Sequence, residues 1–197
     1  MNGQLDAVIQ AVIPNIVQSI QPFKENNSVD DFLLVSVLRQ TLFHIIEGAI
    51  VDSYPVSTAI AGVGNTEGSG KTPLGVHRIA EKIGDNAEYG ELFKARVSTN
   101  NIATILTTDG QFSDIDAITT RILWLDGLEL GNNKGTSLVK GKHIKVDSYQ
   151  RYIYIHGTDE EWRLGRSAYH GCIRMANHAI SELYDKVYVN TLVVIIE

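Results

Sequence analysis

Short runs of β-branched and aromatic residues, separated by turn residues, dominate the chain from Leu33 onward. Runs at 33–38 and 41–46 come first, and a turn at Glu47-Gly48 leads into the next run. Two such runs joined by a short turn that contains glycine predict a β-hairpin. Later runs predict strands at four further places, which are residues 104–108, 118–125, 144–146 and 152–156. The body of the chain is therefore predicted to be mainly β.

Helical spacing marks both ends of the chain. The first apolar stripe recurs at i, i+3, i+4 and i+7 and comprises Leu5, Val8, Ile9, Val12, Ile13, Ile16, Val17 and Ile20. It predicts an amphipathic helix, kinked or split at Pro14, before a polar linker at 22–31. Such a stripe either packs on the domain that follows or binds a partner, and both interpretations stay open. Near the end, Asn177 is predicted as the N-cap of a second helix, which precedes a last strand within 187–196.

Composition narrows the class of protein. The 197 residues are 44% hydrophobic and 20% charged with only 4 prolines, which is typical of one globular domain rather than a disordered chain. The formal net charge of −6 and the absence of a basic block disfavour a nucleic-acid partner. No Lys or Arg precedes Lys24 and polar residues interrupt the first apolar stretch, so neither a signal peptide nor a membrane span is predicted.

Residues 62–75 (GVGNTEGSGKTPLG) form the one glycine-rich stretch of the sequence. Its end resembles a phosphate-binding loop, but that motif requires glycine where this chain has Asn65. Pro73 and Gly75 also leave no helix N-terminus for the phosphates. We therefore expect a loop closed by a turn at Thr72-Pro73, and only loss of ATP binding in Lys71→Ala would restore the nucleotide interpretation.

The chemically distinctive residues lie between His156 and Arg174. Cys172 is the only cysteine, so no intramolecular disulfide can form. His156 ends a predicted strand and can take the thiol proton, after which an ion pair between thiolate and imidazolium is expected to lower the thiol pKa. A backbone carbonyl near Gly157 is expected to fix the imidazole tautomer. Gly171 would let backbone amides approach a substrate oxyanion closely.

Two other interpretations of Cys172 are open from the sequence. A lone cysteine is by default a small buried hydrophobic residue, although a core strand would not be flanked by His170-Gly171 and Arg174. Cysteine with two histidines is also a known zinc ligand set, which would use His156, His170 and Cys172. A histidine two residues before the cysteine on one strand, however, gives awkward ligand geometry.

The complete pattern resembles the L,D-transpeptidase catalytic domain, also called the YkuD domain. The residues that carry the resemblance are His156-Gly157-Thr158, Leu164-Gly165 and His170-Gly171-Cys172-Ile173-Arg174-Met175, followed by a helix that starts near Asn177. Residues 53–59 resemble an early strand of the family, and 68–84 resemble its Thr-Pro-x-Gly segment. The resemblance extends from about Phe32 to Ile196.

The resemblance implies a mainly β fold, a β-rich α+β sandwich or distorted barrel with a capping helix after the cysteine. It implies that residues 31–197 form a catalytic domain behind an N-terminal helix and linker at 1–30. The implied reaction cleaves the bond between diaminopimelate and the terminal D-Ala of a peptidoglycan tetrapeptide stem. The resulting thioester passes to an amine, giving a 3→3 cross-link or a similar product. Hydrolysis of the same intermediate, as an L,D-carboxypeptidase, and a non-catalytic envelope-binding module remain as alternatives.

The resemblance also assigns roles to residues. Cys172 is expected to be the nucleophile, His156 the base, and His170 with Gly171 the scaffold of the oxyanion region. Gly157, Tyr169 and Arg174 are expected on the substrate-binding side, where Arg174 either pairs with a substrate carboxylate or braces the loop. Tyr169 stands where the family usually has Ser or Thr, and its ring is expected to narrow the acceptor side and to favour small acceptors.

The expected partners follow from the same family. They are peptidoglycan stem peptides and carbapenem-type inhibitors, and neither a cofactor nor a metal is expected. The substrate implies a location in the cell envelope or periplasm, although no export signal is visible at the start of this sequence. The sequence specifies neither the acyl acceptor nor the oligomeric state.

Overall fold

Ten β-strands form one sheet in the computed structural model, which describes residues 2–24, 30–168 and 170–197. The strands are β1 (Asp31–Ser36), β2 (Thr41–Ile46), β3 (Ala49–Ser57), β4 (Gly75–Ile83), β5 (Glu91–Lys94), β6 (Val97–Ile102), β7 (Ile118–Gly127), β10 (Tyr154–Gly157), β11 (Ile173–Met175) and β12 (Leu192–Ile196). A separate hairpin contains β8 (Thr136–Val139) and β9 (Lys142–Lys145). The helices are α1 (Asn2–Ile20) and α2 (Asn177–Lys186), with short 3₁₀ turns η1 (Gln21–Phe23) and η2 (Glu161–Arg163).

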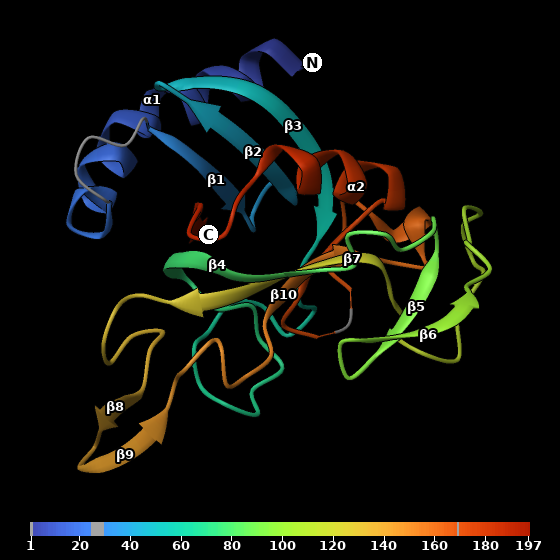
Figure 1. Cartoon of the computed structure of the whole chain (residues 1–197). Helices are drawn as coiled ribbons and strands as arrows, with labels where there is room; N and C mark the ends of the chain where they lie inside the picture. The colour runs from blue at the N-terminus through green and yellow to red at the C-terminus, as the bar shows by residue number, and fades with distance from the viewer. Residues whose placement is uncertain (1, 25–29, 169) are drawn as a thin grey trace.

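One pairing closes the sheet on itself. Strand β10 pairs with β11 on one side and with β7 on the other, so that eight strands close in the order β10-β11-β3-β2-β1-β12-β4-β7. Strands β5 and β6 extend from β7 beyond the closed part (Figure 1). The prediction of a mainly β fold with a distorted barrel is therefore confirmed.

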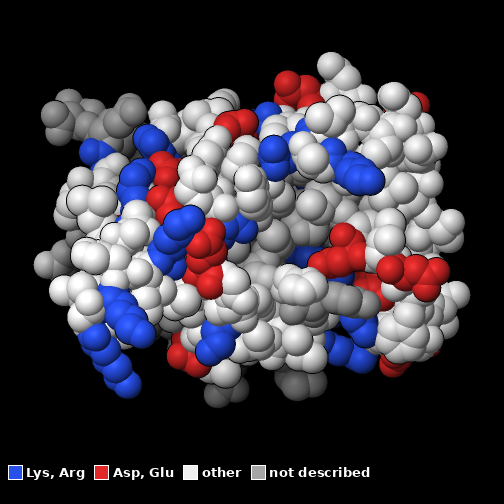
Figure 2. Space-filling view, turned by 90° about the horizontal axis from the view of Figure 1, so that it is seen from below, with Lys and Arg blue, Asp and Glu red and all other residues white. Residues whose placement is uncertain are grey.

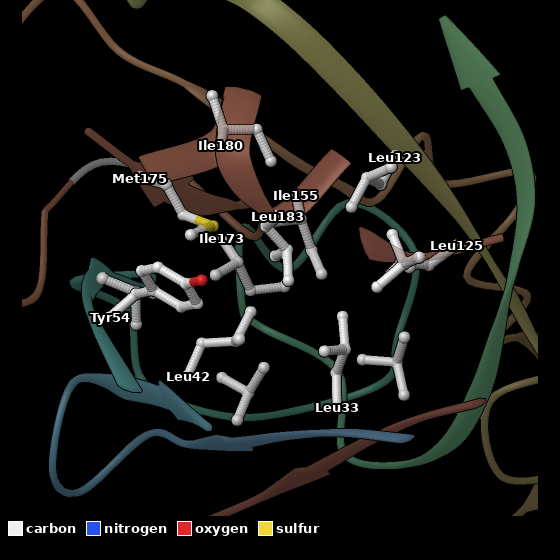
Figure 3. Packing of buried hydrophobic residues seen from close by; sticks show 14 of the residues in the cluster. Leu33, Leu42, Tyr54, Leu123, Leu125, Ile155, Ile173, Met175, Ile180 and Leu183 are labelled. Carbon is white, nitrogen blue, oxygen red and sulfur yellow. The ribbon is translucent and has the colours of Figure 1, made fainter. Parts of the chain in front are cut away.

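The interior of the barrel is filled by alternate residues of its strands and by α2. Figure 3 shows Leu33, Leu123, Leu125 and Ile155 converging there with residues of the helix. Ile180 and Leu183, one turn apart on α2, are fully buried in the same cluster. The helix that follows Cys172 thus caps the core, as the resemblance implied.

The N-terminal helix α1 covers the outer face of the barrel, on the side of β1 and β2 (Figure 1). Phe32 and Leu34 point outward from β1 and pack against the apolar stripe of α1, which consists of Ile9, Ile13, Ile16 and Ile20. Their neighbours Leu33 and Val35 belong to the interior cluster. Strand β1 is therefore buried on both faces, which explains its continuous apolar sequence. The burial of this stripe favours the interpretation that α1 packs on its own domain.

Two local predictions were wrong, and a third was wrong in part. Residues 104–108 form no strand, and Leu106 makes only an isolated bridge with Glu160. Helix α1 is not split, since Pro14 lies inside one continuous helix, and the alternative of a kink at Pro14 stays a prediction. Asn177 is the first residue of α2 rather than its N-cap, because its side chain is occupied by Thr119 and Thr120 of a neighbouring strand. For Leu106 and Asn177, tertiary contacts override the local signal.

Neither of the α-helices that the structure describes is long and apolar enough to cross a bilayer.

His77 on β4 is a wholly buried histidine outside the candidate site. Its Nδ1 lies 3.0 Å from the Gly75 carbonyl oxygen and its Nε2 3.0 Å from Ser148 Oγ. Burial lowers the pKa of His77 to about 4 from its ordinary value of 6.5. Between pH 6.5 and 4, His77 therefore stays neutral in the native state, whereas it is protonated in the unfolded chain.

We expect the free energy of unfolding to fall as the pH drops from 6.5 to 4, by about 3 kcal/mol through His77, since one pKa unit is worth about 1.4 kcal/mol. The stabilisation is fully present above pH 6.5 and is lost toward pH 4. Urea unfolding between pH 4 and 7 measures it, with His77→Gln as the non-titrating control. Parallel pH curves for the two proteins would contradict this assignment.

Candidate active site

Neighbouring parallel strands bring His156 and Cys172 to one face of the sheet. His156 on β10 pairs with Arg174 on β11, and Cys172 lies two residues before Arg174. Cys172 itself precedes β11, and its side chain packs against the cluster of Trp124 and Tyr154. Tyr154 lies two residues before His156 on β10, so the two side chains share a face. The pairing of β10 with β11 thus brings His156 and the turn that carries Cys172 to the same face of the sheet.

His156 is 2% exposed and has a defined tautomer. Its Nδ1–H donates to the carbonyl oxygen of Gly157 at 2.7 Å, so the proton sits on Nδ1 and Nε2 is free to accept one. Burial lowers the pKa of His156 below its ordinary value, although the Gly157 carbonyl and the charge of Asp116 act in the opposite direction. The imidazole is therefore neutral at pH 7, as a general base must be.

Cys172 is partly exposed, and its side chain contacts aromatic residues and a backbone carbonyl. The Sγ donates to the carbonyl oxygen of Tyr152 at 3.4 Å, and the side chain packs near Trp124 and Tyr154. These surroundings desolvate the thiol and raise its pKa to about 11. The expected lowering of the thiol pKa is therefore wrong for the resting protein, because loss of hydration outweighs the nearby positive charges. Thiol and imidazole are both neutral before any substrate binds.

The backbone at Tyr152 has an uncommon conformation for an aromatic residue. Its φ of 58° lies in the left-handed region, which strains a residue that carries a Cβ. The amide of Tyr152 is held by the Tyr149 carbonyl at 3.1 Å. The carbonyl that accepts the Cys172 thiol is thus presented by a turn just before β10.

Two glycines are required by close packing. A Cβ on Gly171 would lie 2.6 Å from the carbonyl oxygen of Lys71. A Cβ on Gly157 would lie 2.6 Å from both Asn177 Oδ1 and the Thr119 carbonyl oxygen. The turn before Cys172 therefore abuts the glycine-rich loop, and Gly157 is buried with its carbonyl directed to His156.

Arg174 is almost wholly buried and is held by two carboxylates. Its Nη1 lies 3.0 Å from Asp116 Oδ1 and 3.5 Å from Glu160 Oε2. His170 has a largely exposed side chain, and its Nδ1 lies 3.5 Å from the same Asp116. This arrangement favours the bracing interpretation of Arg174, because the guanidinium ties the loops around the site together.

Two other expectations concern Tyr169 and metal binding. Tyr169 lies outside the described residues, so its place in the cleft stays a prediction. Across residues 2–24, 30–168 and 170–197, no three His, Cys, Asp or Glu side chains converge in a group that could hold a metal ion. His156, His170 and Cys172 accordingly do not form the ligand set considered from the sequence.

Sequence reasoning missed Asp116, Glu160, Arg151 and Tyr152. Asp116 lies far from Cys172 in the chain, and nothing in its neighbourhood distinguishes it from an ordinary loop aspartate. Tyr152 contributes a backbone carbonyl, which no side-chain pattern can reveal. Glu160 and Arg151 lie near His156 in the sequence. A search for a carboxylate that could pair with a buried Arg174 would have pointed to Glu160.

The comparison with protein families agrees with the residue pattern. The L,D-transpeptidase catalytic domain family (YkuD) matches residues 30–195. Solved structures with a similar fold include an L,D-transpeptidase from Mycobacterium smegmatis, with 15% identity, a TM-score of 0.47 and coverage of 86% of this chain and 60% of that one. L,D-transpeptidase 3 from Mycobacterium tuberculosis, solved with a faropenem-derived adduct, has 14% identity, a TM-score of 0.47 and coverage of 86% and 61%.

A third similar structure is the L,D-transpeptidase from Xylanimonas cellulosilytica, with 15% identity, a TM-score of 0.45 and coverage of 93% of this chain and 70% of that one. The chain spans about 60% of the length of the first of these structures. No curated protein sequence matches the chain. Because the family match covers most of the chain and includes both His156 and Cys172, the protein belongs to the L,D-transpeptidase catalytic domain (YkuD) family.

Proposed function

We propose that the protein is a cysteine L,D-transpeptidase that acts on peptidoglycan stem peptides, with residues 31–197 as its catalytic domain. The observation that supports the proposal is that Cys172, the sole cysteine, packs beside Tyr154 on the face of β10 that also carries His156, whose Nδ1–H donates to the Gly157 carbonyl oxygen. Family membership supports the same reaction class. Cys172 is the proposed nucleophile and His156 the proposed general base.

Acylation begins with proton transfer from Cys172 to Nε2 of His156 as the sulfur attacks the carbonyl carbon between diaminopimelate and D-Ala. The tetrahedral intermediate then expels the amine of D-Ala, which takes the proton back from the imidazolium. The product is a thioester on Cys172. Because both groups are neutral at rest, the charged pair forms only while the substrate is attacked.

The remaining predicted residues shape the site around this step. Gly171 and the backbone of Cys172 are proposed to bind the oxyanion, with His170 beside them at the solvent side. Gly157 orients His156 through its carbonyl, and Arg174 holds Asp116 and Glu160 in place. Tyr169 is proposed to border the acceptor side and to limit the size of the acceptor.

A pocket of about 400 Å³ lies on the segment that connects His156 to Cys172. Its lining includes Trp162, Arg163 and Arg166, and the two arginines pair with Glu160 and Asp109. Figure 2 shows Lys and Arg interspersed with Asp and Glu over one face of the molecule. We propose that the stem peptide approaches the cysteine along this segment.

The proposal extends to location and inhibition. A peptidoglycan substrate places the working enzyme in the cell envelope. A carbapenem-type β-lactam would acylate Cys172 in the manner of the stem peptide, because its strained amide reacts with the same thiolate.

Incubation with purified disaccharide tetrapeptides tests the function, with products identified by mass spectrometry. We expect loss of D-Ala together with a tetrapeptide–tripeptide dimer that contains a 3→3 link. Tripeptide without dimer would assign the protein as an L,D-carboxypeptidase. Unchanged tetrapeptide with measurable binding would instead identify an envelope-binding module.

A further inference from the structure

Arg151 is a half-buried arginine in the turn between β9 and β10, and its guanidinium is engaged by one segment of backbone. Its Nη1 donates to the carbonyl oxygens of Gly64 at 3.3 Å and Asn65 at 3.0 Å, and its Nη2 donates to that of Lys71 at 2.6 Å. All three acceptors belong to the glycine-rich loop, residues 62–75. One side chain thus binds both arms of that loop.

The loop in turn contacts the turn that carries Cys172. The Lys71 carbonyl that accepts from Arg151 is the atom that a Cβ on Gly171 would approach to 2.6 Å. The two arms of the loop are joined by hydrogen bonds from the Gly64 amide to the Thr72 carbonyl at 2.9 Å and from the Thr72 amide to the Gly62 carbonyl at 3.1 Å. Any outward shift of the loop would therefore open the space beside Gly171.

Arg151 also contributes charge at the thiol. Among the described residues, the charged or titratable groups that interact with the Cys172 thiol include Arg151, Arg174, Asp116 and Tyr154. Burial and the charge of Asp116 raise the pKa of the thiol, whereas the charges of Arg151 and Arg174 lower it. Arg174 is ion-paired with two carboxylates, whereas the hydrogen bonds of Arg151 go to neutral carbonyls and Glu67 acts on Arg151 only through its charge. The charge of Arg151 is accordingly less neutralised by its hydrogen-bond partners.

We propose that Arg151 is a positioning residue of the reaction: it clamps the glycine-rich loop against the Gly171-Cys172 turn and supplies positive charge that stabilises the thiolate. The inference rests on the proposed role of Cys172 as nucleophile. It gives a function to the glycine-rich stretch, which becomes a wall of the site. Two substitutions separate the two parts. Arg151→Gln retains a donor for the carbonyls without the charge, and Arg151→Lys retains the charge without the planar fork.

The chain has one cysteine, so alkylation by iodoacetamide reports on Cys172 alone. In Arg151→Gln we expect the pH midpoint of alkylation to rise and the rate at pH 8 to fall about three- to tenfold, because thiolate falls tenfold for each pKa unit. In Arg151→Lys the midpoint should stay near that of the wild type. Hydrogen exchange at the amides of Gly64 and Thr72 should accelerate about tenfold in Arg151→Lys, because the clamp is lost.

Arg121 provides the matched control, since its Nη1 also donates to two backbone carbonyls, those of Ala87 and Thr120. Arg121→Gln and Arg121→Lys should leave both readouts unchanged. A wild-type midpoint in Arg151→Gln would overturn the proposal, as would wild-type loop exchange in Arg151→Lys. Neither measurement uses a substrate, so the proposal on Arg151 can fail or succeed separately from the proposed function. Thermal unfolding shows whether Arg151→Gln or Arg151→Lys has lost its fold. If one of them has, the readout of the variant that still folds tests the proposal.

Discussion

Replacing Cys172 by alanine is expected to reduce D-Ala release from tetrapeptides to the uncatalysed background, a loss of at least about 10⁴-fold. No other thiol exists in the chain to take over the attack. The same substitution should abolish the covalent adduct with a carbapenem, which intact-protein mass spectrometry detects as one added molecule per chain. The fold should survive, because alanine is smaller than the partly exposed cysteine that it replaces.

Cys172→Ser serves as the companion variant, since it keeps the size of the side chain but replaces the thiol by a poorer nucleophile. Thermal unfolding of both variants separates loss of chemistry from loss of structure. Substantial D-Ala release by Cys172→Ala, with a wild-type melting temperature, would exclude Cys172 as the nucleophile.

Replacing His156 by glutamine should lower the acylation rate by about 10² to 10⁴-fold, the usual contribution of a positioned general base. Glutamine fills similar space and can still donate to the Gly157 carbonyl, but it cannot accept the thiol proton. Burial holds the pKa of His156 below 6.5, so His156 stays an unprotonated base down to that pH. The wild-type acylation rate should therefore fall on the acid side only below pH 6.5. Stopped-flow acylation by a carbapenem across pH 4 to 9 measures both effects.

His178→Gln provides a control histidine, because His178 lies on the exposed side of α2. It should retain wild-type rates and the wild-type fall on the acid side. An unchanged fall on the acid side in His156→Gln would assign the titration to another group. Inactivation by EDTA and recovery with zinc would favour a metal-dependent reaction instead.

Most of the predicted strands and the candidate pair His156 and Cys172 were predictable because both have strong local signals. The first hairpin follows from β-branched runs around Glu47-Gly48, and the structure contains it as β2 and β3. The order of His156, Gly171 and Cys172 in the family pattern was sufficient to identify the family that matches residues 30–195. These signals depend on adjacent residues, so a single sequence carries them.

The environment of the thiol was not predictable for the opposite reason. The pKa of Cys172 is raised chiefly by burial and is further changed by the charges of Asp116 and Arg151, which lie on separate loops of the chain. The wrong prediction of a strand at 104–108 has the same origin. Within that segment Leu106 makes one isolated bridge with Glu160 and no ladder of paired residues forms. Local propensity cannot show which of several apolar runs finds a pairing partner.

Closure of the barrel also bears on how the protein behaves when it is concentrated. A strand that is hydrogen-bonded to a neighbour on both sides has no unpaired backbone N–H and C=O groups for a strand of a second molecule. An edge strand has such groups on one side and can pair with another chain. Among the strands that the structure describes, the open end of the large sheet is β6, which pairs only with β5. Its sequence, VSTNNI, is polar at its centre and is interrupted by Asn100 at a φ of 55°. The edge most available for aggregation is thus short, hydrophilic and irregular, which should keep the protein dispersed at high concentration.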